Sequence, residues 1–225
     1  MQKAVILLSG GLDSATAAGV ALESGYDLYA LSFSYGQRHS RELESAKKVA
    51  DFYKVRDHKI LQIDLGKLGG SSLTDENMAV PESREPDDIS ETIPTTYVPA
   101  RNTIFIGYAL AYAEVIDADA IFIGANARDY SGYPDCRPEY FTAFQQLADL
   151  CNKRGVEGRP VELKTPLIDM TKAEIIKKGM ELGVPYGHTW SCYQGGSQPC
   201  GTCDSCLLRA KGFREAGAVD PALNK

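Results

Sequence analysis

The chain of 225 residues carries 24 basic and 30 acidic side chains, and 44% of it is hydrophobic. This composition argues against disordered, collagen-like and membrane-embedded proteins and suits one α/β domain with elaborations. A formal net charge of −6 also argues against broad binding to DNA or RNA, because neutralising phosphates requires a basic face. We therefore expect a small-molecule substrate and no nucleic-acid or membrane partner.

The N-terminal residues lead into a short apolar run, Ala4 to Leu8. The run is too short for a signal-peptide core or a membrane span, so we expect a cytoplasmic protein. Because the cytosol keeps thiols reduced, metal ligation is a better interpretation of the six cysteines than disulfide formation.

The first part of the chain alternates between strand and helix patterns. Strands are predicted over residues 3–8, 27–34 and 58–65, and helices over 12–23 and 41–53. Such alternation predicts βαβ units. The expected fold is α/β, with a doubly wound, mostly parallel sheet.

Residues 66–97 break this pattern, because Gly, Ser, Asp, Glu and Pro dominate them. A span of this length suggests a mobile or substrate-covering insertion, and a linker between domains is the alternative. Beyond it, helices are predicted over 103–116, 139–152 and 171–182, and strands over 120–124 and 161–168. Thr171 and Glu174 form the capping-box pattern at the start of the last of these helices.

A glycine turn, Ser9-Gly10-Gly11-Leu12-Asp13-Ser14, connects the first predicted strand to the first helix. Its backbone N–H groups and the helix N-terminus would face an anion. It is not a Walker A loop, because it lacks Gly-Lys-Ser/Thr. A capped helix after a tight turn is the alternative. Asp13 is unusual in such a place, since a carboxylate repels phosphates unless Mg²⁺ bridges them or the carboxylate caps local N–H groups.

Four cysteines near the C-terminus follow a C-x7-C-x2-C-x2-C pattern: Cys192, Cys200, Cys203 and Cys206. Four thiolates form a closed tetrahedral Zn²⁺ site, and a closed site is structural rather than catalytic. Ordinary buried cysteines and an iron–sulfur cluster are the alternatives, but the reaction expected below needs no electron transfer. Cys151 is expected in the core, and Cys136 is a candidate to line a pocket.

Several segments, in this order along the chain, resemble one enzyme family. The glycine turn matches the SGGxDS loop of the N-type ATP pyrophosphatases, the PP-loop superfamily. Three further segments and the terminal cysteines resemble those of the 7-cyano-7-deazaguanine synthases of queuosine biosynthesis. The segments are Tyr35-Gly36-Gln37-Arg38-His39, Val98-Pro99-Ala100-Arg101-Asn102 and Gly132-Tyr133-Pro134-Asp135-Cys136-Arg137-Pro138. The resemblance covers nearly the whole chain.

This resemblance implies an adenine nucleotide alpha hydrolase-like ATP-binding domain over residues 1–185, with the insertion at 66–97, and a small helical zinc-binding segment over 186–225. It implies an ATP-dependent carbon–nitrogen ligase that joins 7-carboxy-7-deazaguanine and ammonia into a nitrile, through an adenylated carboxylate and then an amide. The expected cofactors are one structural Zn²⁺ per chain, and Mg²⁺ with ATP as co-substrate. Adenylation makes chemical sense, because a carboxylate has no leaving group until AMP supplies one.

The resemblance also implies the site residues. The expected ATP-binding residues are Leu8, Ser9, Gly10, Gly11, Leu12, Asp13, Ser14, Ala15, Thr16, Ala17 and Ala18. The expected substrate-binding residues are Tyr35, Gln37, Arg38, Arg101, Asn102, Asp129, Tyr133, Asp135 and Arg137.

The roles of these side chains have alternatives. Arginines bind phosphate or carboxylate through paired hydrogen bonds, or form surface ion pairs. Tyrosines stack on a heterocycle or pack, and aspartates accept from its N–H groups or stabilise turns. The catalytic residue is not identified; Asp13 and His39 are candidates, and a structural histidine is equally compatible. Lys164 and Lys172 are expected to be solvated at the surface.

Two rival functions share part of this pattern. A tRNA-modifying ATP pyrophosphatase, of the thiolation or lysidine type, would carry the same loop, but tRNA binding usually needs a basic surface. A non-enzymatic zinc-stabilised binding module would leave the glycine turn unexplained. A homodimer is the default expectation for assembly.

Overall fold

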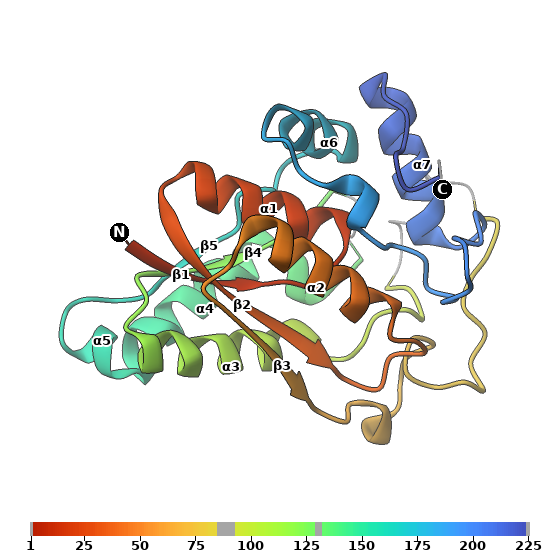
Figure 1. Cartoon of the computed structure of the whole chain (residues 1–225). Coiled ribbons are helices and arrows are strands. Elements are labelled where there is room, and N and C mark those ends of the chain that lie inside the picture. The colour runs from red at the N-terminus through yellow and green to blue at the C-terminus, as the bar shows by residue number, and fades with distance from the viewer. Residues whose placement is uncertain (1, 85–92, 129–131, 224–225) are drawn as a thin grey trace.

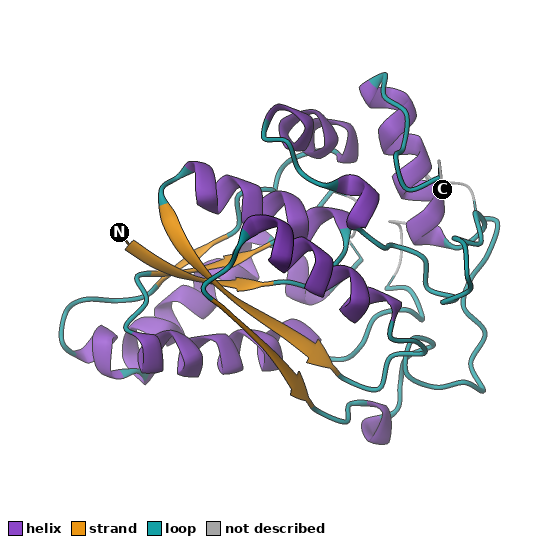
Figure 2. Ribbon diagram, viewed as in Figure 1, coloured by secondary structure: helices purple, strands orange, loops and turns teal. Residues whose placement is uncertain are grey.

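A five-stranded parallel sheet forms the centre of the computed structural model, which describes residues 2–84, 93–128 and 132–223 (Figure 2). The strands are β1 (Gln2–Leu7), β2 (Tyr26–Ser34), β3 (Asp57–Gln62), β4 (Ala120–Ile123) and β5 (Glu162–Lys164). Their order in the sheet is β3-β2-β1-β4-β5, and all the pairings between neighbours are parallel. The expected α/β fold with a parallel sheet is confirmed.

Helices cover both faces of the sheet (Figure 1). On one face, α1 (Leu12–Glu23) and α2 (Arg41–Tyr53) pack on the sheet, α6 (Lys172–Glu181) packs against α1, and α7 (Asp204–Ala216) packs against α6. On the other face, α3 (Arg101–Ile116) and α4 (Pro138–Cys151) pack on the sheet, and α5 (Lys153–Val156) packs against α4. Successive side chains of β1 point to opposite faces of the sheet and pack into the hydrophobic core on each face. Ala4 and Ile6 pack with α1, whereas Val5 packs with α3. Both faces of this strand are therefore buried, which explains its unbroken aliphatic sequence.

The strand order reverses direction at β1. The chain passes from β1 outward to β2 and β3 and then returns to β4 on the other side of β1. In doubly wound sheets this reversal leaves a crevice at the carboxyl ends of the two strands, where ligands bind. The glycine turn and the residues after Ile123 meet there.

The start of α6 has the expected capping box. The Thr171 hydroxyl accepts from the Glu174 backbone N–H at 3.3 Å, and the Glu174 carboxylate accepts from the Thr171 N–H at 2.8 Å. This reciprocal pair fixes where the helix begins and therefore which way its first side chain, Lys172, points.

Two predicted strands are shorter in the structure than expected, and the first of them, β3, ends at Gln62 and not at residue 65. The last strand is shorter than residues 161–168, because the chain turns after Lys164, with the Ile168 N–H donating to the Thr165 carbonyl at 3.2 Å. Within the insertion, a short 3₁₀ helix η1 (Gly66–Leu68) is followed by turns, and the Ser72 N–H donates to the Thr95 carbonyl at 2.8 Å. Among the described helices, none is long and apolar enough to cross a membrane.

Candidate active site

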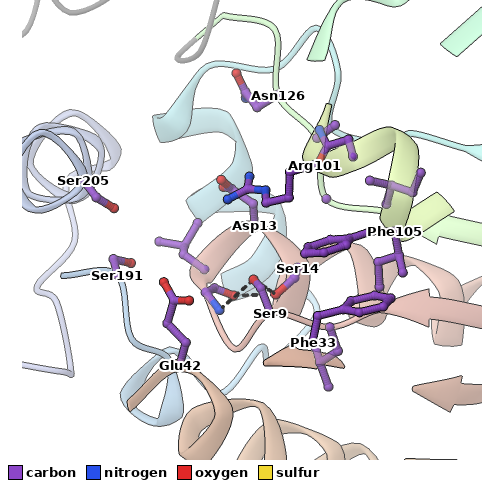
Figure 3. Close-up of a pocket in the computed structure, with 18 of the residues that line it drawn as sticks. Ser9, Asp13, Ser14, Phe33, Glu42, Arg101, Phe105, Asn126, Ser191 and Ser205 are labelled. Atoms are coloured by element: carbon purple, nitrogen blue, oxygen red, sulfur yellow. Dashed lines mark hydrogen bonds between the residues drawn. The ribbon is translucent and has the colours of Figure 1, made fainter. Parts of the chain in front are cut away.

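A cavity of about 220 Å³ opens at the carboxyl ends of β1, β2 and β4 (Figure 3). Its walls come from the glycine turn, the ends of these strands, the first turns of α2, α3, α6 and α7, and the segment that leads into the cysteines. Segments far apart in sequence thus meet where the fold places its ligands.

The glycine turn forms one wall and depends on two glycines. Gly10 has a φ of +86°, and a Cβ there would lie 2.1 Å from the Glu42 carbonyl oxygen. A Cβ on Gly124, just after β4, would lie 2.7 Å from the Ser14 backbone nitrogen. Any other residue at either position would push the turn out of place.

Hydroxyl groups hold the turn in shape. The Ser9 hydroxyl donates to the Ser14 hydroxyl at 3.0 Å, and the Ser14 hydroxyl also lies 3.1 Å from the Gly11 carbonyl. Of the expected ATP-binding residues, those lining the cavity are Leu8, Ser9, Gly11, Leu12, Asp13 and Ser14. The following residues, Ala15, Thr16, Ala17 and Ala18, are buried in α1 instead.

Asp13 pairs with Lys172, which corrects the expectation that this lysine is solvated at the surface. The Lys172 ammonium donates to both carboxylate oxygens, at 2.7 and 2.8 Å, and only 9% of the lysine side chain is exposed. Its aliphatic stem fits because Gly212 of α7 has no side chain; a Cβ there would lie 2.3 Å from the Lys172 Cγ. Lys164, in contrast, forms a partly exposed ion pair with Glu162.

The wall opposite the turn is aromatic and cationic. Arg101, the first residue of α3, lies with its guanidinium carbon 5.7 Å from the centre of the Tyr35 ring. The Tyr133 hydroxyl is 2.7 Å from the Thr96 hydroxyl. Burial raises the pKa of Tyr35 to about 12 and also raises the pKa of Tyr133, so both phenols stay protonated at neutral pH.

Asn102 and the residues it binds support this wall. Its backbone N–H donates to the Asp135 carboxylate at 3.0 Å, and its side-chain amide donates to the Asp135 carbonyl at 2.9 Å. Asp135 therefore supports the start of α3, and it does not line the cavity. Cys136 does line it, and burial raises the pKa of its thiol to about 12. Arg137 is exposed outside the cavity.

The YGQRH segment divides between the cavity and the insertion. The Gln37 side chain lines the cavity and accepts from the Tyr35 N–H at 2.7 Å. Arg38 instead donates to the carbonyls of Ser72, at 2.7 Å, and of Asp75, at 3.0 Å. It therefore anchors the insertion and does not line the cavity.

His39 lies against the cysteine segment. Its Nε2 is 3.0 Å from the Cys192 carbonyl oxygen, and it does not line the cavity. Burial lowers the pKa of this imidazole, so it is neutral at pH 7. Asp129, also expected at the site, lies outside the described residues.

Several cavity residues were not predicted from the sequence. Phe33 and Phe105 stack with ring centres 4.0 Å apart. Others that line the cavity are Glu42, Asn126, Trp190, Ser191, Tyr193 and Arg209. Arg209 is occupied by a buried ion pair with Asp220. For Glu42, the sequence offered one signal of a place in the cavity, because this residue closely follows the YGQRH segment.

The four predicted cysteines come together in space. All four Sγ atoms lie within 4.8 Å of one another, close to the spacing of about 3.8 Å that a tetrahedral Zn–S distance of about 2.3 Å implies. Backbone N–H groups of Gln194 and Cys200 point to the Cys192 sulfur at 3.4 and 3.3 Å, as they do around bound thiolates. The residues therefore fit a metal ion.

The cysteine cluster is connected to both the insertion and the glycine turn. The Ser83 N–H donates to the Thr202 carbonyl at 2.8 Å, and Arg84 forms an ion pair with Asp204 at the start of α7. On the other side, the Trp190 N–H donates to the Gly10 carbonyl at 2.9 Å. A metal ion at the cysteines would consequently stabilise one wall of the cavity.

Known proteins resemble this chain along nearly its whole length. The model of a family described as queuosine biosynthesis protein QueC matches residues 3–217. The 7-cyano-7-deazaguanine synthase of Saccharophagus degradans is 60% identical over 98% of this chain and 96% of its own, and that of Acetivibrio thermocellus is 58% identical over 98% and 96%. Among solved structures, a predicted tRNA methyltransferase subunit from Methanocaldococcus jannaschii superposes with a TM-score of 0.49 and 16% identity, covering 80% of this chain and 75% of that one.

Proposed function

The chain belongs to the queuosine biosynthesis protein QueC family, and from this premise we propose that it converts 7-carboxy-7-deazaguanine and ammonia into 7-cyano-7-deazaguanine at the expense of ATP. The observation that carries the proposal is that the phosphate-binding turn and the Arg101 wall face one cavity. The turn offers N–H groups to a triphosphate, and the guanidinium offers paired donors to a carboxylate.

The turn would act on the pyrophosphate. As the substrate carboxylate attacks the α-phosphorus of ATP, charge grows on the pyrophosphate that leaves, and the N-terminus of α1 with the Ser9 and Ser14 hydroxyls would stabilise that charge. Lys172 adds a positive charge beside Asp13, which would otherwise repel the phosphates. Mg²⁺ bound to ATP would offset further charge, and Asp13 is the carboxylate of this turn that reaches the cavity.

The opposite wall would hold the heterocycle and its carboxylate. We assign Arg101 to the carboxylate, and Tyr35 and Tyr133 to contacts with the rings of the deazapurine. Gln37 and Asn102 shape the same wall. Arg38 and Asp135 would act from outside the cavity, as supports, whereas the Arg137 side chain is exposed outside it.

The reaction requires two activations. Ammonia attack on the acyl adenylate expels AMP and gives an amide, which still carries one oxygen. Water is a poor leaving group from that carbon, so adenylation of the amide oxygen is needed before the nitrile forms. One cavity suffices for both steps if the heterocycle stays bound while pyrophosphate exchanges for ATP.

We further propose that the cysteine cluster, part of a C-terminal segment at 186–225 added to an ATP-binding domain at 1–185, holds one structural Zn²⁺. Four thiolates leave no open coordination position, so the ion would supply stability and not chemistry.

One experiment tests the proposed enzymatic function. The protein is incubated with 7-carboxy-7-deazaguanine, ATP, Mg²⁺ and ammonium, and the product is identified by mass spectrometry. The nitrile is expected, and no conversion would refute the proposal.

A homodimer is the assembly we propose. Helix α3 is apolar on nearly all sides, yet Tyr108 and Val115 on its outer face are 43% and 81% exposed. A helix that is apolar all round is normally buried, so a second copy packed on this face would account for the sequence. The molar mass in solution, compared with 24.5 kDa for one chain, tests this.

Replacing Lys172 by methionine is expected to lower the rate of acid-dependent ATP–pyrophosphate exchange by about 100-fold, because the phosphate site loses a positive charge and the Asp13 carboxylate loses the ammonium that offsets its repulsion of the phosphates. Lys172→Arg should recover part of the rate. The matched control is Lys178→Met on the same helix, where the lysine pairs with Glu23 at the surface. Equal rates for Lys172→Met and the control would exclude Lys172 from the site.

A further inference from the structure

One carboxylate in the cavity has no role in the scheme so far. Glu42, in the first turn of α2, lines the cavity, and Figure 3 shows its side chain on the side of the phosphate turn near Ser191. Within residues 2–84, 93–128 and 132–223, no hydrogen bond or ion pair holds its carboxylate, in contrast to Asp13. A carboxylate that faces a cavity without a partner is free to bind a group of the substrate.

The environment of Glu42 suits proton transfer. Burial raises the pKa of its carboxyl group to about 7, and the positive charge of Arg101 only partly counteracts this effect. Both protonation states are then populated at neutral pH, which is the condition under which a general base is most effective.

The other acid–base groups of the described cavity are unsuited to accepting a proton. Asp13 is paired with Lys172, while Tyr35 and Cys136 are held protonated, with pKa values raised to about 12. Tyr133 likewise remains a neutral phenol. The cations that face the cavity are Lys172, Arg101 and Arg209. Besides Asp13, Glu42 is the only carboxylate that lines the described cavity, and we therefore assign the uptake of the proton to it.

The reaction releases protons from nitrogen at two stages. In the first, the N–C bond forms between ammonia and the adenylated carboxyl carbon, the C–O bond to AMP breaks with its electron pair on the oxygen, and one proton leaves the nitrogen. In the second, the adenylated amide loses two protons from nitrogen as the third C–N bond forms and AMP departs. Neither stage needs an oxidant or a reductant.

We propose that Glu42 is the catalytic base of these nitrogen steps. It takes the proton from ammonia as ammonia attacks the acyl adenylate, releases that proton to solvent, and then takes one of the two protons of the adenylated amide as the nitrile forms, while the other proton passes to water. This inference rests on the proposed function. It assigns Glu42 no part in adenylation, in which no proton is transferred, and so separates it from Lys172 and the phosphate turn.

The test is Glu42→Gln, which keeps the shape of the side chain and removes its basicity. Acid-dependent ATP–pyrophosphate exchange without ammonium should stay within about twofold of the unaltered protein, whereas amide and nitrile formation should fall about 100-fold. Glu44→Gln is the matched control, because Glu44 lies in the same helix turn at the surface, beside Arg41, and should leave both rates unchanged. Melting temperatures of both variants show whether they are folded.

A second nucleophile sharpens the test. Hydroxylamine is unprotonated at neutral pH and needs less help from a base, so Glu42→Gln should lose about 10-fold or less in hydroxamate formation. If the variant loses exchange as severely as amide formation, Glu42 binds substrate or ATP and the inference is overturned. An equal loss with ammonia and hydroxylamine would also overturn it. If the unaltered protein shows no acid-dependent exchange, the proposed function itself fails.

Discussion

Cys203→Ala is expected to yield little soluble protein, and what is recovered should be less stable by about 4 kcal/mol or more. Cys203 is completely buried at the start of α7, and its sulfur is one of the four that would hold Zn²⁺. Removing one ligand loses metal-binding free energy, which in a structural site is folding free energy. The measurements are zinc content by mass spectrometry and thermal unfolding.

The matched control is Cys151→Ala. Cys151 was expected in the core, but it is the exposed last residue of α4 and lies outside the cluster, so its loss should change neither zinc content nor stability. About one Zn²⁺ per chain is expected in the unaltered protein. Cys203→Ala protein with full stability would contradict a structural metal, and a visible-light chromophore in the unaltered protein would point to an iron–sulfur cluster.

Gly124→Ala is expected to lower kcat/KM for ATP by about 100-fold while the protein still folds. The added Cβ would lie 2.7 Å from backbone atoms of Asp13 and Ser14, so the phosphate turn must shift. Overpacking of this kind costs about 1–3 kcal/mol, which lowers the melting temperature without unfolding the chain. Steady-state kinetics with varied ATP measures the effect.

Gly187→Ala is the control for this substitution. Among the described residues, the Cβ added there would come no closer than 3.8 Å, to Pro221, which is an ordinary contact, so the kinetics of Gly187→Ala should match those of the unaltered protein. Normal ATP kinetics in folded Gly124→Ala protein would show that the turn can shift without consequence, and would remove the turn from the phosphate site.

Features encoded locally could be predicted from the sequence. The alternation of strands and helices, the turn after β1 and the capping box of α6 each depend on residues a few positions apart. The cysteine pattern is equally local, because C-x2-C spacings bring thiolates together whatever the rest of the fold does.

Contacts set by tertiary packing could not be predicted. Lys172 and Asp13 are 159 residues apart, and their ion pair exists because α6 lies over α1 and Gly212 leaves room for the lysine stem. Arg38 matched a motif, yet its donors are used by carbonyls of the insertion, whose irregular sequence gave no sign of where it would pack. Glu42 faces the cavity because of where the helix starts.

The number of AMP molecules released per nitrile tests most directly the claim that one phosphate turn activates first the acid and then the amide. Starting from 7-carboxy-7-deazaguanine and ammonium, two AMP per nitrile are expected. Starting from synthetic 7-amido-7-deazaguanine without ammonium, one AMP per nitrile is expected. Failure of the amide to react, or the same AMP yield from both substrates, would contradict two activations at one turn.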